Sequence, residues 1–189
     1  KSDAPAGSDA RKIGDLYRSY MDLEARNAAG IKPLQPLLER IAAIDSRAAL
    51  IEAFGRAGVD GTSSPFGGGV GIDRMNPDRY LLGIGVGGLG LPDKDYYLNP
   101  DARFVTIRAA YLKHIERMLG FAGMQDVGKR AEAILALETR IAEQQWDRAA
   151  RRDRDKTYNL TPFADLEKSY GGYDWVAHFR AAGIELPEK

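Results

Sequence analysis

Apolar side chains recur at intervals of three and four residues along most of this 189-residue chain, and this spacing constrains its fold more than any other feature. Such spacing gathers the apolar residues on one face of an α-helix. Most of the stripes follow a residue that can cap a helix or a proline that fits its first turn. These starts are Ser8-Asp9, Pro33, Asp45-Ser46, Asn99-Pro100, Asp126, Thr161-Pro162 and Asp174. The pattern therefore predicts six or seven helices.

Glycine residues predict where several of these helices end, because glycine readily adopts the backbone conformation that follows a helix. The first helix is expected to end at Gly30 and the third near Gly55 or Gly58. The longest helix, from Asp126 to about Ala150, has one mainly apolar side that also includes two polar residues. The residues on this side are Ala131, Ile134, Leu135, Glu138, Ile141, Ala142, Gln145 and Trp146. The remaining ends are expected at Gly120, Gly123 and Gly183.

A stretch rich in glycine and serine, residues 58–71, interrupts the helical pattern and predicts a loop. Val70–Asp73 and Tyr80–Val86 are typical of strands, and Asn76-Pro77-Asp78 between them is typical of a turn. The predicted fold class is therefore mainly α: a multi-helix lobe with one small β-hairpin at about residues 70–87. Residues 1–8 are expected to be a disordered or linker tail, and residues 9–189 the helical region of a longer chain.

Charge and cysteine content exclude several kinds of site. Lysine plus arginine equals aspartate plus glutamate, 27 against 27, so no excess positive charge favours nucleic acid or an anionic membrane. The chain has no cysteine, which excludes disulfides, thiolate metal sites and a cysteine nucleophile. No apolar run approaches the roughly 18–20 residues of a membrane span. A targeting sequence removed before the polar start is compatible with this sequence.

Histidine is too sparse to predict a zinc peptidase centre in this chain. A His-Glu-x-x-His motif on a helix places two imidazoles on one face for zinc, but the motif is absent. The two histidines, His114 and His178, fall on different predicted helices, and we expect both to be solvated. The Gly-x-Ser-x-Gly signature of a serine nucleophile is also absent.

Gly85–Gly90 matches Gly-x-Gly-x-x-Gly after a predicted strand, which is compatible with a dinucleotide site. That site requires a helix to open at the third glycine, whereas Leu91-Pro92-Asp93 follows here. A tight glycine corner is therefore favoured. Asp93 and Asp95 are compatible with an acid/base pair, but turn and capping roles are favoured. The charged run Asp147–Lys156 is compatible with nucleic-acid binding, but intramolecular ion pairs are favoured.

The string Gly88–Leu98, which reads GLGLPDKDYYL, resembles the G-L-G-L-P-D-[RK]-D-Y-Y-L stretch of the neprilysin family of zinc metallopeptidases. That family includes the endothelin-converting enzymes and the bacterial PepO-like oligopeptidases. Further matches follow in family order and together span about residues 11–184. They are Leu16–Asp22, Gly30–Leu34, Ile134–Ala142, Arg152–Asn159 and Tyr173–Trp175. Two positions depart from the family pattern: Val86 replaces a glutamine, and Tyr20 replaces a cysteine of animal members.

The resemblance implies that the chain is the N-terminal, non-catalytic region of such an enzyme. The family's His-Glu-x-x-His, its later zinc-binding glutamate and its Asn-Ala-[YF] substrate segment would all follow Lys189. No catalytic or metal-binding residue is therefore assigned within this chain, and its substrate-binding residues stay unassigned. Zinc is expected in the parent enzyme, bound outside this chain, and Gly88 and Gly90 are expected to form a tight structural corner.

In the family, this helical lobe faces a C-terminal thermolysin-like catalytic half and limits entry to peptides and small polypeptides. We therefore expect a lid that is inactive alone, with that catalytic half and peptide substrates as partners. The resemblance also implies a periplasmic, cell-envelope or secreted bacterial protein. Two other functions stay open: a stand-alone module that binds peptides or proteins without catalysis, and a structural oligomerisation domain.

Overall fold

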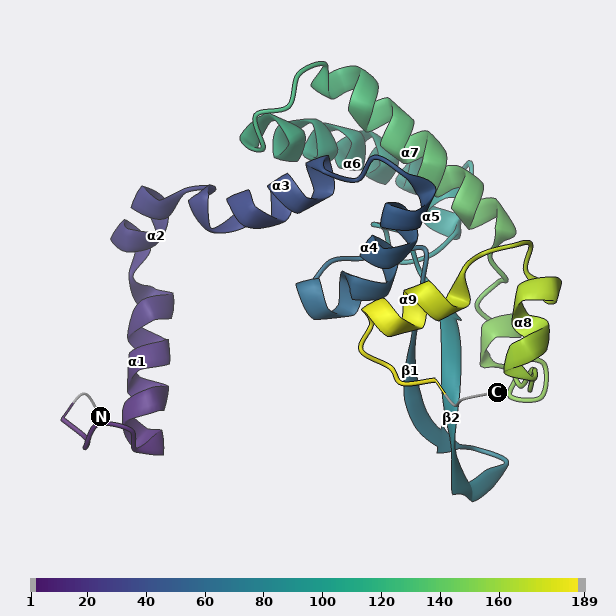
Figure 1. Ribbon diagram of the computed structural model, residues 1–189. Helices are drawn as coiled ribbons and strands as arrows, with labels where there is room; N and C mark the ends of the chain where they lie inside the picture. The colour runs from purple at the N-terminus through teal and green to yellow at the C-terminus, as the bar shows by residue number, and fades with distance from the viewer. Residues whose placement is uncertain (1–2, 187–189) are drawn as a thin grey trace. The chain divides into compact units, whose positions relative to one another are not determined.

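The computed structural model describes residues 3–186 and is mainly helical with one β-hairpin, which confirms the predicted fold class (Figure 1). The helices are α1 Asp9–Met21, α2 Leu23–Ala29, α3 Gln35–Ala42, α4 Arg47–Asp60, α5 Asp95–Leu98, α6 Ala102–Phe121, α7 Val127–Gln144, α8 Phe163–Ser169 and α9 Trp175–Ala181. The strands are β1 Phe66–Asp73 and β2 Asn76–Val86, and 3₁₀ turns lie at Lys32–Leu34 and Ala150–Arg152.

The chain divides into two compact units, residues 1–39 and residues 40–189. In the first unit, α1 begins where the Ser8 side chain accepts a hydrogen bond from the Arg11 amide, as the sequence predicts. The single helix expected up to Gly30 is wrong, because the Asp22 carboxylate accepts from the Ala25 amide at 2.9 Å and starts α2 there. Lys1 and Ser2 of the predicted tail, like residues 187–189 of the predicted helical region, lie outside the described residues.

In the second unit, α4 passes through both of the glycines predicted to end it and stops only at Gly61. Gly55 is buried against α9, where an added Cβ would lie 2.1 Å from the His178 carbonyl oxygen. The glycine therefore allows two helix backbones to approach closely. Gly61 has a φ of +68° and supplies the left-handed residue that terminates the helix.

The hairpin is longer than the predicted one, because β1 begins at Phe66 inside the stretch expected to be a loop. The two antiparallel strands pair from Phe66 opposite Val86 to Ile72 opposite Tyr80. Asn76-Pro77-Asp78 belongs to β2, so the predicted turn is wrong. The turn occurs earlier, at Arg74 and Met75, where the Asp73 carboxylate accepts a hydrogen bond from the Met75 amide at 2.9 Å.

Between the hairpin and α6 lies α5, a short helix that the sequence pattern did not predict. The helix expected at Asn99-Pro100 begins later, because the Asp101 side chain accepts from the Arg103 amide at 2.8 Å and caps α6. Asn99 instead accepts from the Asp101 amide at 3.0 Å. The next helix, α7, ends at Gln144 rather than near Ala150.

An aromatic cluster forms the core where β1 meets the C-terminal helices. Leu166 of α8 and Trp175 and Phe179 of α9 are buried, and Phe66 and Leu82 of the hairpin pack against them. Around them, the rings of Phe66, Phe163, Tyr173, Trp175, His178 and Phe179 contact one another. The predicted cap of α9 is confirmed, because the Asp174 carboxylate accepts from the Ala177 amide at 2.8 Å.

We predict that Gly55→Ala and Gly58→Ala, two changes in the same helix, alter stability in opposite directions. Gly55→Ala should lower the free energy of unfolding by about 1–3 kcal/mol, because its methyl group pushes α4 away from α9. Gly58→Ala should raise it by about 0.5–1 kcal/mol, because the site is open and alanine favours the helix. Urea unfolding of both variants measures the difference; a Gly55→Ala protein as stable as Gly58→Ala would refute the close packing.

Candidate functional site

The segment Gly88–Leu98, which we call the anchor segment, contains the glycine corner and α5. It contacts α6 and α7 through Gly90 and Tyr97. The Tyr97 hydroxyl donates to Glu138 Oε2 of α7 at 2.7 Å, and it accepts from the Leu91 amide at 2.8 Å. The Tyr111 hydroxyl of α6 donates to the other oxygen of Glu138 at 3.1 Å. One carboxylate thus joins three helices and the segment that resembles the neprilysin family.

These tyrosines stay protonated at neutral pH. Burial raises the pKa of Tyr97 above its ordinary value, and the hydrogen bond to Glu138 raises it further. Burial followed by the Glu138 charge raises the pKa of Tyr111 to about 12. Both hydroxyls therefore act as fixed donors to Glu138, and neither is suited to release a proton in a reaction near pH 7.

Asp93, the first carboxylate considered for acid/base chemistry, is buried and closed off. It forms an ion pair with Arg148 and accepts from the Asp95 amide at 3.0 Å. Burial acts to raise the pKa of Asp93, but these two hydrogen bonds outweigh burial and hold the pKa below its usual range. Asp95 is exposed at the start of α5. The two residues therefore form a turn rather than a proton-transfer pair.

A second buried carboxylate, Asp73, connects the hairpin turn to the segment 154–158. Tyr158 donates to it at 3.0 Å, and Arg79 Nε donates at 3.0 Å. Burial acts to raise the pKa of Asp73, but Arg79, the Met75 amide and Tyr158 together lower it. Nearby, Arg74 donates to the Thr157 hydroxyl at 3.1 Å. The Asp73 carboxylate is therefore ionised and fully engaged in holding the hairpin.

The glycine corner has the packing role favoured by the sequence. Gly88 has a φ of +81°, and a Cβ added there would lie 2.9 Å from Pro65 Cα. A Cβ at Gly90 would lie 1.9 Å from the Tyr111 hydroxyl, so a side chain there would displace that hydroxyl from Glu138. Helix α5 opens only at Asp95 and has four residues, so the corner does not present the helix start that a dinucleotide site needs.

The two histidines lie in different environments. His114 is exposed on α6, as predicted, and its Nδ1 lies 3.3 Å from Arg117 Nη2. The prediction of a solvated His178 is wrong: it is 2% exposed, and its Nδ1 lies 3.0 Å from the Tyr173 hydroxyl. Helical periodicity did not reveal this burial, because α9 packs against both α4 and the hairpin.

The zinc implied by the resemblance does not fit the donors that this chain provides. Among the side chains that the structure describes, no three from histidine, aspartate or glutamate lie together in a way that could hold a metal ion. His178 is enclosed by aromatic rings, and the buried Asp73 and Asp93 are held by arginines. We therefore derive no zinc chemistry from these residues.

Glu138 and Asp73 are the two polar centres that the sequence patterns did not identify as such. The available signal for Glu138 was its place within the apolar side of the longest predicted helix, where a charged residue needs a buried partner. Asp73 gave no comparable signal, because its partner Tyr158 lies 85 positions later in the chain.

The family model for the N-terminal region of peptidase family M13 matches residues 1–189 of this chain. Endothelin-converting enzyme-like 1 of Mus musculus is 28% identical over 185 residues, which cover 90% of this chain and 24% of that protein. Endothelin-converting enzyme 1 of Homo sapiens is 25% identical over 188 residues, which cover 93% of this chain and 24% of that protein. The chain thus spans about a quarter of the length of these relatives.

The structure is also similar to solved structures of the zinc metalloprotease Zmp1 of Mycobacterium tuberculosis. The TM-score with the inhibitor complex is 0.86 at 39% sequence identity, over 96% of this chain and 28% of that chain. The open state gives a TM-score of 0.82 at the same identity. The likeness therefore extends over both sequence and fold.

We predict that this protein loses stability between pH 7 and pH 5 because of His178. Burial lowers the pKa of His178 in the folded state, so unfolding takes up a proton there. Its contribution to stability is full above the unfolded-state pKa of about 6.5 and falls below it, by at most about 1.4 kcal/mol per pH unit. The free energy of unfolding should become less dependent on pH over this range in His178→Gln but not in His114→Gln; equal slopes for all three proteins would contradict the assignment.

Proposed function

From the premise that this chain belongs to peptidase family M13 and is its N-terminal region, we propose that it forms the helical lid lobe of a zinc metalloendopeptidase. The parent enzyme hydrolyses peptides and small polypeptides, and this lobe restricts which substrates reach the catalytic centre. The lobe is inactive alone. The observation that carries the proposal is the match of the whole chain to the family combined with its coverage of only 28% of the Zmp1 chain.

The internal chemistry of the second unit supports a structural rather than a catalytic lobe. Asp73 and Asp93 are paired with arginines, and Glu138 is held by two tyrosines. A general acid or base needs access to substrate and a pKa near the working pH. Asp73 and Asp93 are buried, and the pKa of each is held below its ordinary value. All three carboxylates connect segments that are far apart in the sequence.

Zinc and the peptide bond to be cleaved belong, in this proposal, to a C-terminal thermolysin-like half of the parent protein. The described residues offer no suitable donor set, so that half supplies the metal ligands. The same half and the peptide substrates are the partners of this lobe. No nucleic acid is required, since the positive and negative charges balance.

The anchor segment supports the role in substrate access. A wall that admits extended peptides and excludes folded proteins has to keep its shape while substrate passes it. Hydrogen bonds from α5 and α6 to Glu138 hold α7 in place, and Lys94 donates to the Gln145 carbonyl at 3.1 Å at the end of α7. Excluding bulk water from the enclosed space also strengthens electrostatic effects at a catalytic centre.

We propose a periplasmic, cell-envelope or secreted location, in keeping with the family resemblance. In the part of the chain that the structure describes, no helix is both long and apolar enough to cross a membrane. The location is tested by fractionating the source cells and probing each fraction with an antibody against this segment.

We predict that the purified 189-residue chain binds no stoichiometric zinc and cleaves no peptide, whereas the parent protein does both. The native mass is measured first, with an antibody raised against this segment. A species far heavier than 20.7 kDa that contains zinc and shows chelator-sensitive hydrolysis supports the proposal. A native species near 20.7 kDa would instead favour the stand-alone binding module. Peptide hydrolysis by the 189-residue chain would refute the prediction that this chain is inactive alone.

We also predict that Gly90→Ala in the parent enzyme relaxes its limit on substrate size. The new methyl group displaces the Tyr111 hydroxyl from Glu138 and loosens α5, α6 and α7. Cleavage of unfolded casein should rise relative to cleavage of a short fluorogenic peptide. Gly85→Ala is the control, because its Cβ meets nothing closer than 4.0 Å. Zinc content confirms that the catalytic half is intact in both variants, and circular dichroism confirms their helical content. An unchanged ratio would argue against the access role.

A further inference from the structure

The outer edge of β2 offers backbone groups that the second unit leaves unpaired. The described sheet has two strands (Figure 1). The Gly87 amide donates to the Pro65 carbonyl at 2.7 Å, so these two residues form a hydrogen-bonded pair at the end of the ladder. Because bonded and non-bonded pairs alternate along antiparallel strands, every second residue of β2 directs its amide and carbonyl away from β1. These residues are Tyr80, Leu82, Ile84 and Val86. None of their backbone groups bonds to another segment among the described residues.

This edge also lacks the usual protection. Proteins shield exposed strand edges with charged residues, prolines, bulges or a covering segment. From Tyr80 to Val86 the sequence has no charged residue and no proline. The outer edge of β1 differs, because α4 packs against β1 and the Ser64 hydroxyl donates to the Phe66 carbonyl. The second unit therefore leaves one uncharged edge of seven residues open, and it is roughly 23 Å long.

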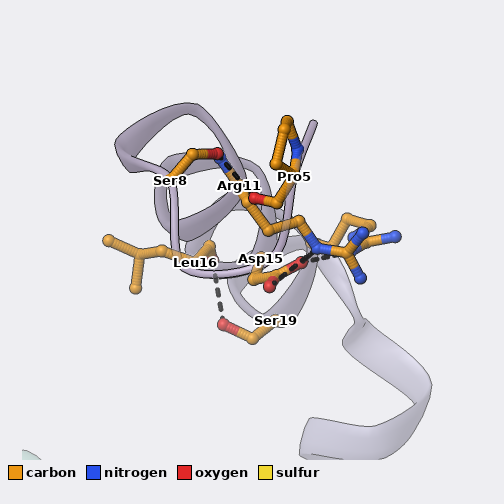
Figure 2. A network of polar contacts seen from close by, with 7 residues as sticks. Pro5, Ser8, Arg11, Asp15, Leu16 and Ser19 are labelled. Carbon is orange, nitrogen blue, oxygen red and sulfur yellow. Dashed lines mark hydrogen bonds and ion pairs between the residues drawn. The ribbon is translucent and has the colours of Figure 1, made fainter. Parts of the chain in front are cut away.

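The described residues of the first unit do not supply a strand for this edge. The helices α1 and α2, the 3₁₀ turn and the start of α3 use their backbone groups in helical hydrogen bonds. The segment before α1 also bonds to itself, because the Ser8 hydroxyl donates to the Pro5 carbonyl at 2.7 Å (Figure 2). A helix has no free row of amides and carbonyls, so it cannot pair with a strand. The first unit therefore leaves the pairing capacity of β2 unused.

A cavity of about 460 Å³ lies at the Val86 end of this edge. Leu137 and Ile141 of α7 give the cavity an apolar wall, and Arg140 and Glu143 give it charged groups. Neither charged side chain forms a hydrogen bond or an ion pair with another described residue. Arg140 is therefore available to donate to a carbonyl, and Glu143 to accept from an amide. The cavity suits one side chain of an extended chain that runs along β2.

We propose that an extended peptide substrate of the parent enzyme binds along Tyr80–Val86 as a third strand and places an apolar side chain in this cavity. The inference rests on the proposed function, which supplies the peptide. In strand addition, main-chain hydrogen bonds provide affinity and side-chain pockets provide preference. A folded protein is a poor occupant, because its own backbone groups are already paired. The edge thus gives the lobe a way to select unfolded chains by their free backbone.

A second copy of this chain is a poorer occupant than a peptide. Stable protein–protein interfaces bury about 1,200–2,000 Å² in total, and one short strand edge offers only a narrow contact. A substrate site has no need of such stability, because the products have to leave it. The small extent of the edge therefore favours a peptide that binds transiently.

The test is amide hydrogen exchange of β2 in the parent protein, measured residue by residue with and without a peptide. The probe is a decapeptide of alternating threonine and valine with a lysine at each end, and a chelator prevents its hydrolysis. Peptide at saturation should slow exchange of the outward amides of Leu82, Ile84 and Val86 at least about tenfold. The amides of Gly83 and Gly85, which face β1, should exchange slowly in both samples and report an intact hairpin.

A proline on the edge separates backbone pairing from side-chain contact. Ile84→Pro removes an outward amide and keeps the ladder with β1, since proline is tolerated where its nitrogen faces solvent. This variant should lose the protection that the peptide gives to Leu82 and Val86. Ile84→Thr is the matched control, because it changes the side chain and retains the amide, and it should keep that protection. If Ile84→Pro speeds exchange at Gly83, Val86→Pro at the strand end takes its place.

The other outcomes each overturn the proposal in a different way. Slow exchange of the outward amides without peptide would show that another segment of the parent protein already covers the edge. If that slow exchange depends on protein concentration, a second copy covers it. Fast exchange with peptide, in a parent that hydrolyses the same peptide when zinc is present, would refute edge binding alone and leave the proposed function standing. A native protein of 20.7 kDa without zinc or hydrolysis would remove both.

Discussion

The carboxylate of Glu138 determines how the central part of the second unit is arranged. It accepts hydrogen bonds from Tyr97 and Tyr111, which come from two other helices, at 2.7 and 3.1 Å. Glu138 is half-buried, and a charge partly withdrawn from water is costly unless donors replace the lost water. Two hydroxyls in fixed positions meet this need without adding a second charge. Gly90 lacks a side chain at the point where the Tyr111 hydroxyl lies. The glycine corner, the two tyrosines and the glutamate are therefore parts of one constraint.

The same kind of contact recurs at Asp73 and Asp93, and in each case the partners include a residue distant in sequence. Asp73 accepts a hydrogen bond from the Tyr158 hydroxyl, and Asp93 forms an ion pair with Arg148. Ionic contacts of this kind add little net stability over apolar packing, but breaking one leaves a buried charge without a partner. They therefore select one arrangement of segments over others. This accounts for a lobe with well-fixed internal geometry whose buried carboxylates are not available for chemistry.

The helical stripes, several helix caps and the presence of a hairpin could be predicted from the sequence, because these depend on neighbouring residues. Ser8 and Asp174 start their helices through bonds that span three positions. The errors occur where distant segments meet. Gly55 continues α4 because α9 packs against it, and His178 is buried by the hairpin and the aromatic rings around it. Neither contact has a signature in the local sequence.

In the candidate site, too, the local segment could be predicted from the sequence and its distant partner could not. The anchor segment was identifiable from its resemblance, but its partner Glu138 became apparent only when α7 was placed beside it. Asp22 shows that even a local contact can escape the pattern, because its side chain caps α2 and so divides the one helix predicted up to Gly30 into two. The apolar stripe of α1 follows the predicted spacing, yet among the described residues of the first unit nothing buries it. Amphipathicity indicates that a helix has a partner but does not identify that partner, and in a chain that spans a quarter of its relatives the partner need not lie within the chain.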